Sequence, residues 1–198
     1  MAKKLLVLCM AAIMAVAALV AGCGGDQKAA SDNKVLKVGT NADFAPFEFQ
    51  DENGKEYQGF DMDLIRAIGE EMGYKVEISN IQFDGLIPAI QAGNIDVAIT
   101  GMTINEERKQ NVLFSDPYYK SGLSIIVAKD NNDIKTFQDL KGKKVAVQIG
   151  TTSAAEVNKI GGVEVKEFNS SADTFMELRA KGVDAVVNDR PVNDYYIL

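Results

Sequence analysis

The stretch Ala-Gly-Asn-Ile-Asp-Val-Ala-Ile at residues 92–99 has a counterpart later in the chain, Ala-Lys-Gly-Val-Asp-Ala-Val-Val at residues 180–187. Each stretch follows a helical pattern, and each ends in a short apolar strand that leads into polar residues. This weak repeat predicts two similar α/β lobes, with the chain crossing between them near residues 122–129. A single α/β domain is the alternative.

Strand and helix patterns alternate on both sides of these stretches. Strands are expected at residues 35–39, 75–79, 95–99, 123–129, 143–148, 163–168 and 183–187. Helices are expected at residues 61–72, at 84–90, after Asn105, at 154–159, from Ser171 or Asp173 to Ala180, and from Pro191. This alternation is typical of parallel or mixed sheets covered by helices.

Local signals mark the ends of several elements. Asp61, Asp84 and Asn105 stand where helices begin, and we expect them to cap those helices. Three phenylalanines surround a proline at residues 40–49, which reads as a loop, and residues 51–55 read as a turn. The polar ends of the strands are therefore the places to look for a site.

Polar residues follow the predicted strands, and open α/β sheets bind ligands beyond the carboxyl ends of their strands. The strand-end residues are Asn41, Asp43 and Phe44, then Gly101, Thr103 and Arg108, then Gly150, Thr151 and Thr152, and finally Asn188, Asp189 and Arg190. An α-amino acid needs such a set. Its carboxylate needs a guanidinium, its ammonium needs a carboxylate, and its side chain needs an apolar wall.

Each of these residues has a simpler structural explanation. Arg108 stands among other charges and reads equally as a solvated charge on a short helix. Asp189 precedes Pro191 and reads equally as a helix cap. Phe44 and Phe83 read as core residues, and residues 151–152 as a cap for the helix that follows them.

The N-terminus has the pattern of a secretory signal. Two lysines precede an uncharged apolar run at residues 5–21. Val-Ala-Gly-Cys at residues 20–23 resembles the bacterial lipobox, which implies cleavage of residues 1–22 and a lipid on Cys23. A transmembrane anchor is the alternative, because the run approaches the minimum length of a membrane span.

Small and polar residues at 23–33 read as a tether between this lipid and the folded part. Cys9 leaves with the signal, so the mature chain keeps one cysteine and no internal disulfide. The fold must then be stabilised by its hydrophobic core.

Charge and composition exclude several function classes. The chain has 21 basic and 28 acidic residues and no histidine, for a formal net charge of −7. This balance argues against binding to nucleic acid or to an anionic membrane surface. The absence of histidine and of a Cys-X-X-Cys pair argues against a zinc site, and we expect neither a metal nor another cofactor.

Six motifs occur in one order: Phe-Ala-Pro-Phe-Glu-Phe at 44–49, Gly-Phe-Asp-Met-Asp-Leu at 59–64, Phe-Asp-Gly-Leu-Ile-Pro-Ala at 83–89, Gly-Met-Thr-Ile-Asn-Glu-Glu-Arg at 101–108, Phe-Ser-Asp-Pro-Tyr-Tyr at 114–119 and Gly-Thr-Thr at 150–152. With this combination, residues 35–198 resemble the polar-amino-acid family of ABC-transporter solute-binding proteins. The resemblance implies a type II periplasmic-binding-protein-like α/β fold. Its two lobes, at 34–121 and 122–198, would be joined by a hinge and separated by a cleft.

The resemblance also implies a role for each site residue. Arg108 would hold the ligand carboxylate together with the backbone N–H groups of Thr103 and Thr151. Asp189, the Gly101 carbonyl and the Thr103 hydroxyl would hold the ammonium group. Residues 59–64 would form a turn and a helix cap, and residues 114–119 would shape the hinge.

The side-chain pocket implied by the resemblance sets specificity. Phe44 and Phe83 would sandwich the ligand side chain. Asn41 stands where some family members that bind cationic side chains have an acid, and Asp43 could partly replace that acid. Gln148 suits a neutral or cationic polar side chain, so arginine or glutamine is the expected ligand.

The implied function is the capture of a polar or basic L-amino acid outside the cytoplasm. The implied partners are an ABC permease with its ATPase, and the membrane through Cys23, with the receptor itself a monomer. A dehydratase-like enzyme on the same fold is the alternative. Family members continue past the position of Leu198 and return to the first lobe, so the resemblance implies that this return segment is missing.

Overall fold

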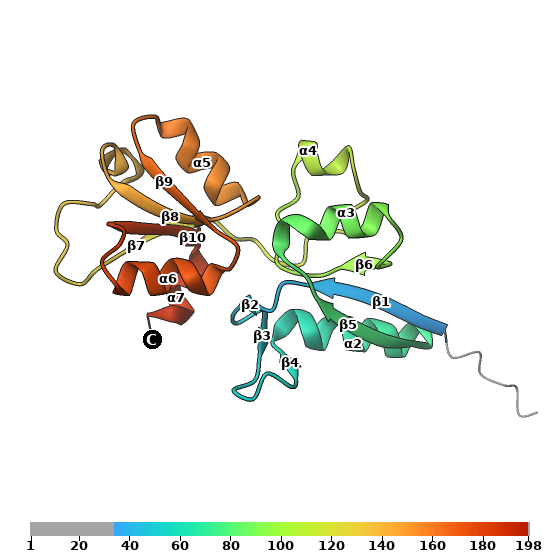
Figure 1. Cartoon of the computed structure of the whole chain (residues 1–198). Coiled ribbons are helices and arrows are strands. Elements are labelled where there is room, and N and C mark those ends of the chain that lie inside the picture. Colours follow the sequence, from blue (N-terminus) through green and yellow to red (C-terminus); the bar gives the residue numbers. More distant parts are fainter. Residues whose placement is uncertain (1–33, 198) are drawn as a thin grey trace, which may run out of the picture. The chain divides into compact units, whose positions relative to one another are not determined.

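A computed structural model describes residues 34–197 (Figure 1). The predicted signal at 1–22, Cys23, the tether at 23–33 and Leu198 lie outside the described residues. Within residues 34–197, no helix is long and apolar enough to cross a membrane.

The first sheet is parallel, with the strand order β5-β1-β6. It comprises β1 (Lys34–Thr40), β5 (Tyr74–Asn80) and β6 (Val97–Ala98). Its crossovers are α2 (Phe60–Met72) and the pair η1 (Phe83–Gly85) and α3 (Leu86–Gln91). Val38, Met62 and Ile65 are buried between this sheet and α2. The predicted strands and crossover helices of this half are thus confirmed.

Two strands of a small antiparallel sheet begin within the predicted loop at residues 40–49. The sheet comprises β2 (Asp43–Phe44), β3 (Glu48–Gln50) and β4 (Tyr57–Gln58). Phe44 and Glu48 are directly opposite each other in this sheet. The loop prediction was wrong because strands of two or three residues are too short to show an alternating pattern.

The second sheet is mixed and has the order β7-β10-β8-β9, with β7 antiparallel to β10. Its strands are β7 (Leu123–Val127), β8 (Lys144–Gln148), β9 (Glu164–Phe168) and β10 (Ala185–Asp189). Its helices are η2 (Phe137–Leu140), α5 (Thr152–Ile160), α6 (Ser171–Arg179) and α7 (Arg190–Tyr196).

Both faces of the second sheet are covered, as its apolar strands require. Val145 and Val147 pack in one core cluster with Val157 of α5. Ala146, which points to the opposite face, packs in another cluster with Phe175 of α6. This layering of helix, sheet and helix leaves the carboxyl ends of β8 and β10 free to carry polar residues.

The repeated stretches form the same local structure in both halves. The N–H of Lys37 donates to Asp96 Oδ2 at 2.8 Å, and the N–H of Lys144 donates to Asp184 Oδ2 at 2.8 Å. Each aspartate also returns its own N–H to the carbonyl of the same lysine. The repeat therefore marks equivalent corners, where β6 joins β1 and β10 joins β8.

We call residues 34–121 the first lobe and residues 122–197 the second lobe. The short helix α4 (Glu106–Lys109) belongs to the first lobe, and the segment at 110–122 leads from it into β7. In Figure 1, the first lobe runs from blue to green and the second lobe from yellow to red.

Candidate functional site: a cleft between the two lobes

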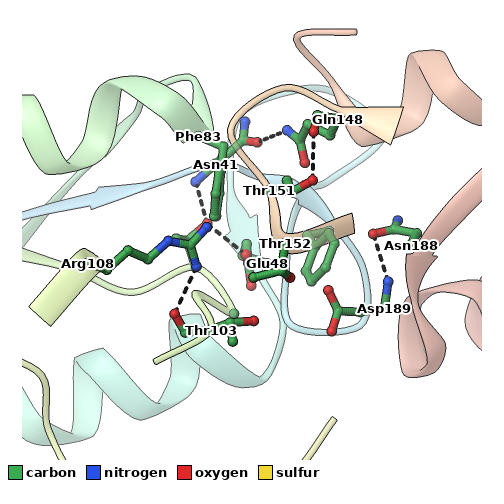
Figure 2. A pocket seen from close by; sticks show the side chains of 13 residues that line it. Asn41, Glu48, Phe83, Thr103, Arg108, Gln148, Thr151, Thr152, Asn188 and Asp189 are labelled. Atoms are coloured by element: carbon green, nitrogen blue, oxygen red, sulfur yellow. Dashed lines mark hydrogen bonds between the residues drawn. The ribbon is translucent and has the colours of Figure 1, made fainter. Parts of the chain in front are cut away.

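A pocket lies where the two lobes meet, and Figure 2 shows the 13 side chains that line it. The first lobe contributes Asn41, Phe44, Glu48, Phe83, Thr100, Gly101, Thr103 and Arg108. The second lobe contributes Gln148, Thr151, Thr152, Asn188 and Asp189. Every predicted site residue except Asp43 is among them, although the two groups lie far apart in the sequence.

Arg108 is buried, with 8% of its surface exposed, so its explanation as a solvated charge is wrong. Asn105 caps α4 as predicted, because its Oδ1 accepts the Arg108 N–H at 2.8 Å. The guanidinium donates from Nη1 to the Thr103 carbonyl at 2.8 Å and from Nη2 to the Gly150 carbonyl at 3.0 Å. Its carbon atom Cζ lies 5.2 Å from the centre of the Phe83 ring. Two carbonyls and one aromatic face therefore fix its direction.

The Arg108 guanidinium retains donors for an anion. It has five N–H groups, and no ion pair in residues 34–197 includes it. Burial lowers the pKa of Arg108 below its ordinary value, and the charges of Glu107 and Asp189 partly oppose that shift. A buried cation without a paired carboxylate makes this part of the pocket attractive to an anionic group.

Asp189 ends β10 at the position before α7, but its side chain makes no capping hydrogen bond. The alternative role as a helix cap is therefore wrong. Its Oδ1 accepts a hydrogen bond from the Ser121 hydroxyl at 2.7 Å. Burial raises the pKa of Asp189, while Ser121 and the charge of Arg108 act to lower it. The pocket thus has a cation on one lobe and a carboxyl group on the other (Figure 2).

The Thr151 side chain caps α5, as expected from the explanation of residues 151–152 as a helix cap. Its hydroxyl accepts the Ala154 N–H at 3.2 Å and donates to the Gln148 carbonyl at 2.7 Å. The first N–H groups of a helix have no partner within that helix and carry partial positive charge. The backbone at Thr151 and Thr152 therefore presents donors to the pocket from the start of a nine-residue helix.

Gly101 brings the backbone of the first lobe close to Phe44. Its φ is 54°, and a Cβ atom here would lie 3.0 Å from Cε1 of the Phe44 ring. Its N–H donates to Asp61 Oδ2 at 3.0 Å. Because glycine has no side chain, the Gly101 backbone can lie directly beside the Phe44 ring, where its polar groups can reach a ligand.

Asn41 and Gln148, the two amide residues predicted to contact the ligand side chain, form a hydrogen bond with each other across the lobes. Gln148 Nε2 donates to Asn41 Oδ1 at 2.7 Å (Figure 2). It also donates to the Asn169 carbonyl at 3.0 Å. Both residues are buried. They therefore form one end wall of the pocket.

Asp43, which was predicted as a site residue, is not among the residues that line this pocket. Its Oδ2 accepts the N–H of Ser171, at the start of α6 in the second lobe, at 2.9 Å. The physical reason is strand alternation, because successive side chains of β2 point to opposite sides and Phe44 takes the pocket side. Asp43 makes an interlobe contact instead.

Three lining residues were not among the predicted ligand contacts: Glu48, Thr100 and Asn188. Glu48 lies opposite Phe44 in the small sheet and so shares its face. Thr100 and Asn188 occupy strand ends, so the rule that ligands lie beyond strand ends is the signal that finds them.

The pocket leaves about 20 Å³ of free space between its walls. A single water molecule needs most of such a volume. Within the part of the chain that the structure describes, no group of three or more His, Cys, Asp or Glu side chains is placed to hold a metal ion. The site is therefore a narrow, charged cleft lined by polar backbone and two phenylalanines.

Comparison with known proteins identifies the family. Residues 36–193 match the family of bacterial extracellular solute-binding proteins, family 3. The arginine-binding extracellular protein ArtP of Bacillus subtilis (strain 168) is 33% identical over 198 residues, which cover 98% of this chain and 76% of that protein.

Two solved structures are also similar. An ancestral arginine-binding protein bound to arginine has 52% identity and a TM-score of 0.81, covering 82% of this chain and 73% of its own. An ancestral arginine-binding protein bound to glutamine has 53% identity and a TM-score of 0.80, and the match covers 82% of this chain and 72% of that chain. These relatives are named as binding proteins and not as enzymes, which is consistent with a solute-binding function for this chain. The chain belongs to the bacterial extracellular solute-binding proteins, family 3, and has the type II periplasmic-binding-protein fold.

Proposed function

We propose that this protein captures a polar or basic L-amino acid, of the arginine or glutamine type, in the cleft between its lobes. Arg108 and the backbone N–H groups of Thr103 and Thr151 bind the α-carboxylate. Asp189 binds the α-ammonium together with the Gly101 carbonyl and the Thr103 hydroxyl.

One observation carries this proposal. A buried arginine on the first lobe and a half-buried aspartate on the second lobe line the same small pocket without pairing with each other. Opposite charges held apart on two walls match a zwitterion, whose carboxylate and ammonium are separated by one carbon atom. Charge-assisted hydrogen bonds to both groups are strong when the site is desolvated.

The remaining walls support binding of a long side chain. Phe44 and Phe83 provide aromatic surface, and stacking on a planar guanidinium or amide group is favourable for such rings. Arginine and glutamine both end in a planar polar group. The relatives whose structures hold arginine or glutamine are consistent with this choice.

Ligand entry requires the lobes to separate, because the free space of about 20 Å³ is far too small for an amino acid. Contacts between the lobes include the Gln148–Asn41, Ser171–Asp43 and Arg108–Gly150 hydrogen bonds. A ligand that touches both lobes favours the closed state through contacts that exist only there. Capture by closure is thus the expected mechanism.

We also propose that the loaded protein delivers its amino acid to an ABC permease driven by its ATPase. The family is extracellular by description, which supports a location outside the cytoplasm. A lipid on Cys23 would keep the receptor near the importer, with residues 23–33 as the tether.

Isothermal titration with a panel of L-amino acids tests the binding proposal. The panel should include arginine, glutamine, histidine and glutamate, with D-arginine as a control for the geometry at the α-carbon. We expect the tightest binding for arginine or glutamine and none for D-arginine. No binding of any panel member by the full-length chain would contradict the proposal.

A further inference from the structure

Two carboxyl groups, one of which lines the pocket, are buried next to each other. Glu48 of β3 and Asp61 of α2 each have 0% of their surface exposed. Glu48 Oε1 accepts the Thr100 hydroxyl at 2.9 Å. Asp61 Oδ2 accepts the neighbouring Gly101 N–H at 3.0 Å and the Tyr118 hydroxyl at 2.8 Å. Both acids therefore hold the same strand end through adjacent residues.

Each carboxyl group has one oxygen left over. Glu48 Oε2 and Asp61 Oδ1 are buried and have no hydrogen-bond partner. Within residues 34–197, no ion pair includes either acid. Two ionised carboxylates buried side by side without a cation would be strongly unfavourable, as would two unsatisfied oxygens.

We propose that Glu48 is a protonated carboxylic acid whose Oε2 donates its hydrogen to Asp61 Oδ1, so that the two residues act as one positioning unit for the strand end at Thr100 and Gly101. A single proton then supplies the missing donor for both leftover oxygens. It also removes one of the two charges, as in other carboxyl pairs that share a site.

The surroundings favour the neutral form of Glu48. Burial raises the pKa of Glu48 well above its ordinary value of 4.5, and the negative charges of Asp61 and Asp43 raise it further. The hydrogen bond from Thr100 acts in the opposite direction. Tyr118 also faces the pair, and burial together with the charge of Asp61 raises the pKa of its hydroxyl. Because the two acids are coupled, their titration belongs to the pair.

The pair links the pocket to the segment between the lobes. The Thr100 hydroxyl, which donates to Glu48, also accepts the N–H of Asn41 at 3.1 Å. Tyr118 lies on the segment that leads into the second lobe, and Asp61 ties it to Gly101. Loss of the shared proton would therefore disturb Asn41 and Gly101 together.

The neutral acid also matters for the ligand, a point that rests on the proposed function. With Glu48 uncharged, Arg108 and Asp189 are the two charged side chains that line the pocket. The pocket then has balanced charge, as a zwitterionic α-amino acid requires. A second carboxylate beside Gly101 would instead favour an additional cation.

The variants Glu48→Gln and Glu48→Ala test the proposal in the full-length chain. A glutamine amide can donate to Asp61 and accept from Thr100, whereas alanine can do neither. We expect Glu48→Gln to unfold at or above the wild-type urea midpoint at neutral pH, because the glutamine amide takes up no proton on folding, and Glu48→Ala at a clearly lower midpoint than Glu48→Gln. Equal urea midpoints of the two variants would overturn the shared proton, because they would show that the hydrogen bonds of an amide at position 48 contribute nothing.

The pH dependence supplies a second readout. A folded-state pKa above 4.5 means that the folded chain holds a proton that the unfolded chain has released. Wild-type stability relative to Glu48→Gln must therefore be greatest below pH 4.5 and fall as the pH rises towards the folded pKa. Parallel pH profiles would contradict the proposal. Infrared spectra at neutral pH should show a carboxylic-acid band in the wild type that is absent from Glu48→Gln.

Titration with L-arginine separates this proposal from the proposed function. If no amino acid binds while the stability and infrared results hold, the proton pair stands and the receptor function fails. If the wild type binds L-arginine, we expect Glu48→Ala to weaken that binding more than Glu48→Gln does. The reverse order would remove the pair from the positioning of Gly101.

Discussion

At the residue scale, Gly101 shows how the pocket depends on a single backbone conformation. Its φ of 54° is one that side chains rarely adopt, and a Cβ atom here would lie only 3.0 Å from Cε1 of Phe44. Gly142 also has a positive φ of 79°, but nothing lies within 4 Å of its Cβ position. A substitution at Gly142 therefore introduces backbone strain alone, whereas the same substitution at Gly101 adds a steric contact with Phe44.

We predict that Gly142→Ala lowers the free energy of unfolding by about 1–2 kcal/mol, the cost of the left-handed conformation for a side chain. Gly101→Ala should cost more, because Phe44 must also move. Urea unfolding of both variants measures the difference. Equal losses would mean that the ring of Phe44 yields freely and does not fix the pocket wall.

The chemical types at the site could be predicted from the sequence, but their environments could not. The strand-end rule and the motifs pointed to Arg108 and Asp189, and both line the pocket. Burial of Arg108 depends on contacts with Gly150 from the other lobe, which local spacing does not encode. Asp61 was predicted to cap α2, yet its carboxylate binds the distant Gly101 N–H. A carboxylate near a helix start can satisfy either donor, and sequence alone does not decide between them.

At the element scale, α4 is a helix of four residues that carries the buried Arg108. Such a short helix has little intrinsic stability, so its cap at Asn105 matters for the site. Thr136 provides a matched case, because it caps η2 with a capping box in the second lobe and does not line the pocket.

We predict that Asn105→Ala and Thr136→Ala each lower the free energy of unfolding by about 1 kcal/mol, the usual value of a cap. Of these two variants, only Asn105→Ala should weaken amino-acid binding, because it removes the acceptor of the Arg108 N–H and so loosens the backbone at that residue. Urea unfolding and isothermal titration on both variants give the two values. A similar loss of affinity in Thr136→Ala would show that affinity follows global stability instead.

The elements with clear periodicity were predicted, and those defined by tertiary contacts were not. The long strands and the helices α2, α5 and α6 match expectation to within a few residues. The small sheet of β2, β3 and β4 was missed, because its strands are only two or three residues long. Asp84 was predicted to cap a helix, but it lies inside η1 and Gly85 precedes α3. The spacing of apolar residues does not show that a 3-10 turn precedes the α-helix here, so it could not locate the start of α3.

At the scale of the whole molecule, the lobes are joined by polar contacts and by Phe47 of the first lobe, which packs in the core cluster of Ala146 and Phe175 in the second lobe. Asp43 binds the Ser171 N–H, and burial raises the pKa of its carboxyl group. Contacts between residues 128 positions apart cannot be read from periodicity. The sequence therefore predicted two sets of site residues without predicting how close they lie.

We predict that Asp43→Ala shifts the ligand-free protein towards open conformations, because Ser171 at the start of α6 loses its acceptor. Small-angle scattering should show a larger radius of gyration than for the wild type. Asp43→Asn, whose amide oxygen can still accept, should show a smaller increase. Asp63→Ala removes an exposed acid of the first lobe and serves as the control. No change in Asp43→Ala would exclude this contact as a determinant of closure.

Binding of an amino-acid carboxylate by Arg108 can be measured in one titration series. Wild type and Arg108→Ala are titrated with L-arginine and with agmatine, its decarboxylated analogue; glutamine and its decarboxylated amine replace them if glutamine binds more tightly. Lys109→Ala, an exposed cation on the same helix, is the control.

We predict that Arg108→Ala loses more than ~2 kcal/mol of binding free energy for L-arginine. We expect little loss for agmatine, so that removal of the Arg108 side chain and removal of the ligand carboxylate are strongly coupled. Lys109→Ala should bind L-arginine like the wild type. Equal losses for L-arginine and agmatine, or unchanged binding of L-arginine by Arg108→Ala, would contradict binding of the carboxylate by Arg108.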